Sequence, residues 1–131
     1  MKILRKIMPE FVDQRGGITR LLDDGRTVIK SVLLLTCKKG SIRANHYHKK
    51  DAHYSYILSG KMEYTEQPVD AEGNFTGKKE TAIIEAGDMV YSPPMTAHAM
   101  RFLEESAFLA LALESRHQGA YEDDTVRVKL I

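Results

Sequence analysis

Four of the five histidines in this chain are spaced as if they could share one site. His46 and His48 are separated by one residue, His53 follows after a polar turn, and His98 follows a turn that contains two prolines. In a β-strand, residues two apart point to the same face, so the first two imidazoles would project together. Neutral imidazoles suit zinc, iron, manganese, nickel or copper. The alternatives are an exposed His-x-His pair and a pocket without metal in which one histidine is a general base.

The elements that must position these histidines are short strands. Segments rich in Val, Ile, Leu, Tyr and Phe alternate with glycine-containing turns, and no window of twelve or more residues carries a 3.6-residue apolar stripe. This pattern predicts an all-β barrel or sandwich. The expected strands are residues 29–36, 54–58, 61–66, 80–85, 89–92, 99–103 and 107–113, with edge strands at 2–8 and 125–131. Residues 67–79 are expected to form a hairpin loop, and residues 114–124 a polar tail.

Composition narrows the class of protein. The chain has 131 residues, which predicts a single domain spanning residues 1–131. Nineteen Lys and Arg against eighteen Asp and Glu give a net charge of +1, which offers no electrostatic basis for binding nucleic acid or a membrane surface. The single cysteine excludes an internal disulfide and a cysteine-based zinc site. With a lone thiol and neither an export signal nor a membrane-length apolar run, we expect a cytoplasmic protein.

The segment of residues 40–60 resembles the first motif of the cupin superfamily, in which two glycines flank a His-x-His pair and a glutamate. The motif positions are occupied, in order, by Gly40, His46, His48, His53 and Gly60. The departure is at the fourth position, where histidine replaces glutamate. A carboxylate would offset part of the metal charge, whereas a neutral imidazole would not.

Residues 87–102 resemble the second cupin motif. Gly87, Pro93 and His98 match it, while Met95 replaces a glycine and Phe102 an asparagine. The resemblance implies a cupin double-stranded β-helix, which is a jelly-roll barrel, and a homodimer. It also implies one divalent transition metal per chain, held in a variant site by His46, His48, His53 and His98. For His53 two other roles stay open, as a residue above a three-histidine site or as a general base.

A second resemblance concerns the substrate. Asp13-Gln-Arg15-Gly16, followed by Arg43 near the histidines of the first motif, is similar to cupins that act on nucleotide sugars. These include dTDP-4-dehydrorhamnose 3,5-epimerases, dTDP-sugar 3,4-ketoisomerases and the cupin domain of a capsular-polysaccharide reductase/epimerase. The similarity implies an isomerase or epimerase that removes a proton next to a ketone, with the enediolate stabilised by metal or by Arg43.

Such a reaction needs a base and groups that hold the small-molecule substrate. If His53 is not a metal ligand, it is the best candidate for the base. The full set of catalytic candidates is His53, Glu63, Tyr56 and Tyr91. The candidates for substrate binding are Arg43, Tyr47 and Arg101. In a regular strand Arg43 and Tyr47 would face away from His46, so the alternative for both is the sheet exterior or a subunit interface.

Two other functions fit the same residues. A dioxygenase would use iron, manganese or copper on three or four histidines, and a non-catalytic module would bind or sense a small ligand without turnover. These alternatives stay open at the level of sequence.

Overall fold

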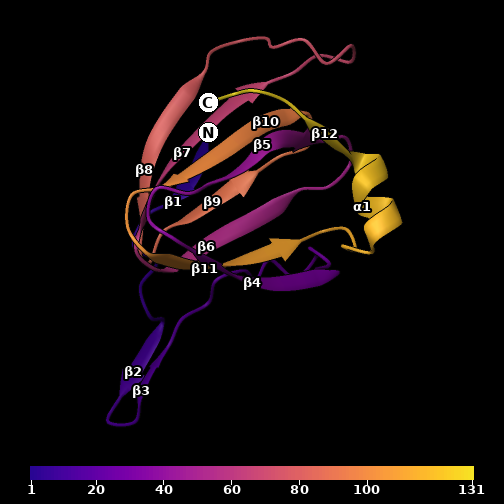
Figure 1. Ribbon diagram of the computed structural model, residues 1–131. Coiled ribbons are helices and arrows are strands. Elements are labelled where there is room, and N and C mark those ends of the chain that lie inside the picture. Colours follow the sequence, from indigo (N-terminus) through magenta and orange to yellow (C-terminus); the bar gives the residue numbers. More distant parts are fainter.

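The computed structural model describes residues 1–131, which fold around two five-stranded antiparallel sheets (Figure 1). One sheet has the strand order β1-β9-β6-β11-β4, and the other has the order β12-β5-β10-β7-β8. The first sheet is formed by β1 (Lys2–Leu4), β9 (Met89–Ser92), β6 (His53–Ser59), β11 (Ser106–Ala112) and β4 (Ser31–Cys37). The second is formed by β12 (Thr125–Arg127), β5 (Ile42–His48), β10 (Thr96–Phe102), β7 (Lys61–Pro68) and β8 (Glu80–Glu85). The sheets face each other as a jelly-roll barrel, so the predicted all-β fold is confirmed.

Alternation along the strands fills the barrel. On β11, buried and half-buried residues alternate along the whole strand, because every second side chain points into the barrel. The main apolar core, which includes Ile57, Met62, Ile84 and Phe102, occupies one end of the interior. A second cluster on the outside of β10 and β5 is covered by the C-terminal residues, including Leu130. One end of the barrel is therefore solid, and the histidines lie towards the other.

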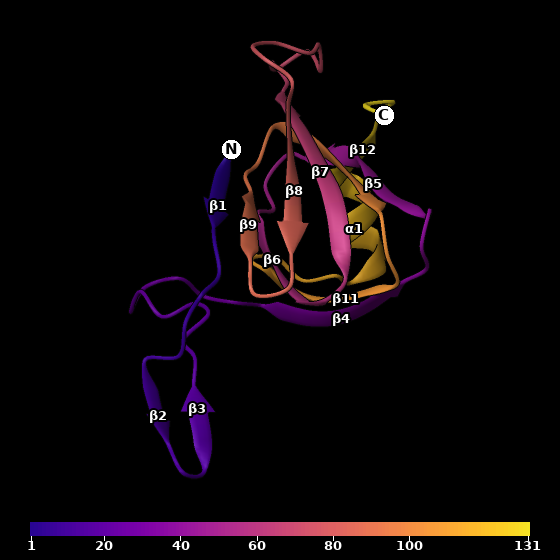
Figure 2. The ribbon, with the colours of Figure 1, turned by 90° about the vertical axis from the view of Figure 1, so that its left-hand side faces the viewer.

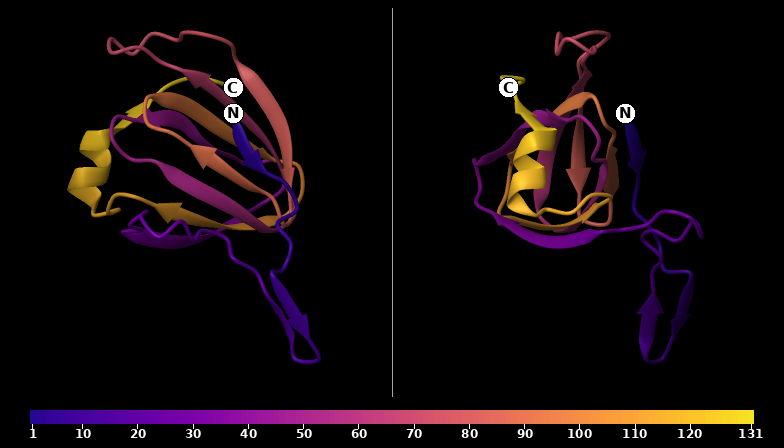
Figure 3. Two further views of the ribbon diagram at one scale, coloured as in Figure 1. Left: turned by 180° about the vertical axis from the view of Figure 1, so that it is seen from behind. Right: turned by 90° about the vertical axis from the view of Figure 1, so that its right-hand side faces the viewer.

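Two elements lie outside the sheets. The β2 (Phe11–Asp13) and β3 (Gly16–Ile18) hairpin projects from the barrel as an arm (Figure 2). The short helix α1 (Gln118–Asp124) lies across one end of the barrel (Figure 3). This helix falls in the segment predicted as a polar tail, and at seven residues it is too short to show a helical stripe. No helix has the length and apolar character needed to cross a membrane.

Several predicted strand limits differ from the structure. The strands expected at residues 80–85 and 89–92 are found as β8 and β9. The strand expected at residues 61–66 continues to Pro68 as β7, and the edge strand expected at residues 2–8 ends at Leu4 as β1. The expected edge strand at residues 125–131 ends at Arg127, because the last residues are held instead by the side chain of Asn45. Its carbonyl oxygen accepts hydrogen bonds from the backbone N–H groups of Leu130 and Ile131, both at 3.2 Å.

Candidate functional site

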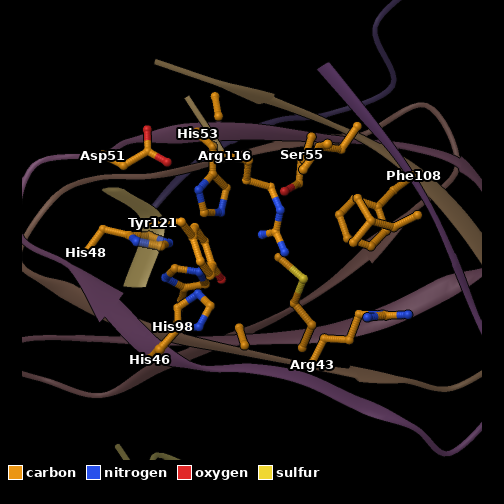
Figure 4. Close-up of a pocket in the computed structure, with 16 residues that line it drawn as sticks. Arg43, His46, His48, Asp51, His53, Ser55, His98, Phe108, Arg116 and Tyr121 are labelled. Atoms are coloured by element: carbon orange, nitrogen blue, oxygen red, sulfur yellow. The ribbon is translucent and has the colours of Figure 1, made fainter. Parts of the chain in front are cut away.

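The four histidines converge inside the barrel (Figure 4). His46 and His48 lie on β5, and His98 on the neighbouring β10 stands directly opposite His46 in the antiparallel register. His53 begins β6 in the facing sheet. The ring centroids are 4.9 Å apart for His46 and His98, and 5.0 Å apart for His53 and His98.

Three of the four imidazoles form the tightest group. Nitrogen atoms of His46, His48 and His98 all lie within 4.8 Å of one another. His53 belongs to a second group with His48 and the carboxylate of Asp51, defined by the same distance. The geometry therefore joins a three-histidine set to an adjacent His–Asp pair.

The ring of His98 is oriented by its own strand. Its Nδ1 lies 3.3 Å from the carbonyl oxygen of Thr96, which can only accept a hydrogen bond, so Nδ1 carries the proton. The other nitrogen, Nε2, is buried and has no hydrogen-bond partner. An unpaired buried lone pair costs free energy unless something else binds it. The Nε2 of His98 is thus available for a ligand in the cavity.

His48 is oriented by a residue far along the chain. The hydroxyl of Thr125 donates to the carbonyl oxygen of Tyr121 at 2.6 Å, so its oxygen accepts a hydrogen bond from Nδ1 of His48 at 3.2 Å. Asp124 lies 3.5 Å from the same nitrogen. Such a partner fixes the ring and leaves Nε2 free to coordinate.

Burial keeps the histidines neutral. It lowers the pKa of His46 to about 2, with the neighbouring His98 and His48 adding to the effect. Burial likewise lowers the pKa of His98 to about 4 and moves the pKa of His53 well below its usual value. The pKa of His48 is also lowered by burial, against the opposing effect of Asp51 and Asp124. Neutral imidazoles have the lone pairs that a metal ion requires.

The donor set fits a divalent transition metal. Three neutral imidazoles that approach one point, one of them with an orphaned buried nitrogen, are a suitable set for zinc, iron, manganese, nickel or copper. A site with three protein ligands leaves coordination positions for substrate or water. The cluster is therefore compatible with a metal site.

Arg43 reaches the cavity wall because β5 is not regular. Ala44 and Asn45 have left-handed backbone angles, with φ of 68° and 55°, and Asn45 is an extra residue between the pairs His46–His98 and Ala44–Ala99. This bulge shifts the alternation by one residue, so Arg43 and His46 line the same cavity. Arg43 therefore does not face away from His46, as it would in a regular strand.

In Figure 4 the side chain of Arg43 points away from the histidines. Its guanidinium donates hydrogen bonds to the sulfur of Cys37 at 3.1 Å and to the carbonyl oxygen of Thr36 at 3.2 Å.

The other two substrate-binding candidates lie on the outer face of the second sheet. Tyr47 is buried beside Leu130 under the C-terminal residues, away from the cavity. Arg101 lies 3.6 Å from the carboxylate of Glu63 on the neighbouring strand, and both side chains are partly exposed. The structure does not bring Tyr47, Arg101 or Glu63 together with the histidines.

The two candidate tyrosines lie on the outside of the first sheet. On β6, His53 and Ser55 line the cavity, so Tyr56 follows the opposite parity. Tyr91 packs against Tyr54 on that outer face, with the ring centroids 4.8 Å apart. Of the catalytic candidates, only His53 lines the cavity.

Three residues that sequence reasoning missed also line the cavity. Asp51 comes from the turn between β5 and β6, and Arg116 and Tyr121 come from the segment around α1 (Figure 4). The carboxylate of Asp51 accepts a hydrogen bond from the backbone N–H of Glu114 at 3.0 Å, and burial raises its pKa. A carboxylate two residues before His53 is the one local signal for Asp51. No local signal marks the other two residues, which are positioned by tertiary structure.

The cavity has two chemically different walls and a volume of about 150 Å³. Its polar lining includes the four histidines, Asp51, Ser55 and Arg116. Its apolar lining is formed by Leu33, Leu35, Met100, Phe108, Ala110 and Ala112. A ligand here would have one polar and one apolar end.

Comparison with protein families gives a match of residues 33–114 to the family described as the cupin domain. Comparison with curated protein sequences gives no match.

Solved structures resemble the chain over most of its length. A variant of the 3,4-ketoisomerase QdtA from Thermoanaerobacterium thermosaccharolyticum, in complex with TDP, has a TM-score of 0.73 and 24% identity, over 96% of this chain and 86% of that one. The dTDP-4-dehydrorhamnose 3,5-epimerase from Sulfolobus tokodaii has a TM-score of 0.74 and 18% identity, over 92% and 73%. A 3,4-ketoisomerase from Helicobacter canadensis has a TM-score of 0.73 and 19% identity, over 96% and 89%. At these identities the similarity shows a shared fold.

Proposed function

Because this chain belongs to the cupin family, we propose that it is a metal-binding isomerase or epimerase that removes a proton next to the carbonyl group of a small substrate. The observation that carries the proposal is the position of His53. It lies in the same cavity as the three-histidine group, with its ring centroid 5.0 Å from that of His98. A neutral base beside a centre that can bind a carbonyl oxygen is the arrangement that enolisation needs.

The roles of the residues follow from their protonation. Burial holds His53 in its neutral form, so the imidazole can accept the proton from the substrate carbon. The carboxylate of Asp51 belongs to the same group of atoms and would stabilise the imidazolium that forms. Returning the proton to the former carbonyl carbon, while the hydroxyl proton of the deprotonated carbon moves to the former carbonyl oxygen, completes an isomerisation. For an epimerisation, His53 loses its proton to solvent and a water molecule protonates the opposite face of the same carbon. A divalent metal held by His46, His48 and His98 would supply Lewis-acid stabilisation of the enediolate oxygen.

The proposal predicts proton exchange that depends on His53. We would incubate the purified protein in D₂O with 2-oxobutyrate or TDP-4-keto-6-deoxyglucose and follow deuterium at the carbon next to the carbonyl by NMR. His53→Ala should reduce the exchange rate by about 10²–10⁴-fold, which is the usual contribution of a general base. The metal content, measured by elemental analysis, should stay unchanged, whereas a His46→Ala/His48→Ala variant should lose the metal.

The control is His117→Ala, because His117 is exposed and outside the cavity. It should leave both exchange and metal content unchanged. Loss of metal from His53→Ala would reject the base role and make His53 a fourth ligand. Oxygen consumption that requires one reducible metal, without deuterium exchange, would favour a dioxygenase. A bound ligand with no turnover would favour the non-catalytic module.

Nucleotide sugars are one candidate substrate class, supported by the ligands named for the similar structures. The turn that suggested them lies on the projecting arm (Figure 2), where the carboxylate of Asp13 pairs with the guanidinium of Arg15 at 2.6 Å. In one chain, this turn therefore lies outside the cavity, which Asp13 and Arg15 do not line.

We also propose that the functional form is a homodimer. The outer face of the first sheet presents apolar side chains to solvent, since Val32 is 62% exposed and Leu34 is 65% exposed. Val12 and Ile18 on the arm are exposed to a similar degree, at 66% and 59%. Exposed apolar surface of this kind is typical of a protein interface.

A further inference from the structure

A buried hydroxyl in the cavity lacks a partner. Ser55 lies on β6, two residues after His53, and its side chain points into the same cavity (Figure 4). The residue is fully buried, yet its Oγ makes no hydrogen bond. Leaving a hydroxyl unpaired away from water costs about 1–3 kcal/mol. A polar group of a ligand would satisfy it.

A cation that lines the same cavity has no carboxylate partner. Each arginine outside the cavity has a carboxylate oxygen within 4.0 Å. Arg43 instead donates to Cys37 and Thr36. Arg116 has neither kind of partner, and its guanidinium lies 4.2 Å from the ring centroid of Tyr121, over its face.

Figure 4 shows Arg116 reaching over the cavity between His53 and Ser55. The residue is exposed to solvent, and in this view its N–H donors point into the cavity.

We propose that Ser55 and Arg116 form a subsite for the carboxylate of a short-chain oxo acid. A guanidinium and a hydroxyl are complementary to a carboxylate, which would accept a hydrogen bond from each. The carbonyl group would then face the histidines, and the apolar end would lie against Phe108 and its neighbours. The assignment of the carbonyl rests on the proposed function, whereas the anion subsite stands on Ser55 and Arg116 alone.

The cavity has room for a small acid but not for a whole nucleotide. A volume of about 150 Å³ is that of a cavity that binds benzene, so the part of a ligand that lies inside has roughly six to eight non-hydrogen atoms. A nucleoside diphosphate is several times larger. It also carries more negative charge than one free arginine can neutralise, and Arg43 at the other end is already engaged with Cys37.

The test is a binding titration of the protein with 2-oxobutyrate as the probe, measured by NMR chemical shifts and by calorimetry. The neutral analogue 2-butanone and the nucleotide TDP are titrated in parallel. We expect 2-oxobutyrate to bind at least about tenfold more tightly than 2-butanone, because a charge-assisted contact contributes more than one tenfold step in affinity. Arg116→Gln should weaken 2-oxobutyrate binding at least about tenfold, and Ser55→Ala by about three- to tenfold.

Two matched variants control for general effects. Arg26→Gln removes a charge from an arginine outside the cavity, and Ser59→Ala removes an exposed hydroxyl from the same strand as Ser55. Both should bind 2-oxobutyrate as the parent protein does.

Several results would overturn the subsite. They are equal binding of 2-butanone, Kd values unaffected by Arg116→Gln and Ser55→Ala in folded protein, or tighter Arg116-dependent binding of TDP than of the acid. Since the readout is binding, it is independent of deuterium exchange. A failure of the subsite is therefore distinguishable from a failure of the proposed reaction.

Discussion

At the scale of single residues, two buried atoms without partners define what the cavity is prepared to bind. The lone pair of His98 Nε2 suits a metal ion, and the hydroxyl of Ser55 suits an anion or another acceptor. Both side chains line the same cavity. Most buried polar groups in folded proteins are paired, so two exceptions in one place mark a site that is stabilised by its ligands rather than by the protein alone.

The unpaired hydroxyl predicts that Ser55→Ala stabilises the protein without ligand. Removing a buried group that makes no hydrogen bond should raise the free energy of unfolding by about 1 kcal/mol. The matched control is Ser92→Ala, since Ser92 is equally buried but its Oγ lies 2.9 Å from the hydroxyl of Tyr64. That variant should lose about 1 kcal/mol. Urea unfolding of the two variants measures both values, and a loss of stability in Ser55→Ala would contradict the prediction.

The set of imidazoles could be predicted from sequence, because the spacing within each cupin motif is local. The orientation of each ring could not. His48 is held by Thr125, which is distant in the chain and approaches only when β12 pairs with β5. Asp51 and Arg116 were missed because each lies in a segment whose local pattern predicts a polar loop.

At the scale of elements, alternation predicted the strands well because both sheets bury one face. It did not predict the bulge in β5, since Ala44 and Asn45 have left-handed backbones without the glycine that usually marks them. The consequence for the site is large, because the bulge changes the side of the strand on which Arg43 lies. Helix α1 escaped prediction because its seven residues contain no buried side chain.

The motif glycines mark places where the backbone must turn sharply. Gly40, Gly60 and Gly87 all have positive φ, at 84°, 88° and 90°. At Gly60, between β6 and β7, a Cβ atom would also collide with the side chain of Ser106 and the carbonyl oxygen of Glu105, whereas at Gly40 it would meet nothing. Gly60 is therefore required for both conformation and space, and Gly40 for conformation alone.

We therefore expect Gly60→Ala and Gly40→Ala to differ. Gly40→Ala should cost about 1–2 kcal/mol, which is the cost of a left-handed backbone in a non-glycine residue. Gly60→Ala should cost at least about 2 kcal/mol more, because the collision forces a shift of the β10–β11 turn. Thermal and urea unfolding measure the difference. Equal losses in the two variants would show that the turn moves freely and that space is not limiting.

At the scale of the whole molecule, the barrel has one closed end, one end covered by a short helix, and one sheet that is left apolar on the outside. The jelly-roll barrel could be predicted from the sequence, because two motifs of fixed order and spacing imply the strands that carry them. The cavity volume and the chemistry of its mouth could not be anticipated, as they depend on where residues 114–124 settle against the barrel. The size and polarity of the ligand are thus set by the tertiary structure.

The exposed sheet face predicts that the protein associates through β4 and β11. Val32 and Leu34 project from the edge strand β4, opposite Leu111 and Leu109 of β11. Burying such a side chain contributes about 1.5–3 kcal/mol, so a Val32→Asp/Leu34→Asp variant should abolish a dimer that uses this face. Ile83→Asp is the control, because Ile83 is 40% exposed on β8 of the other sheet. Sedimentation equilibrium should give the mass of a dimer for the parent protein and for Ile83→Asp, and that of a monomer for the double variant. A monomeric parent protein at about 100 µM, far above the Kd of a stable dimer, would rule out association through this face, and a double variant that stays dimeric would place the interface elsewhere.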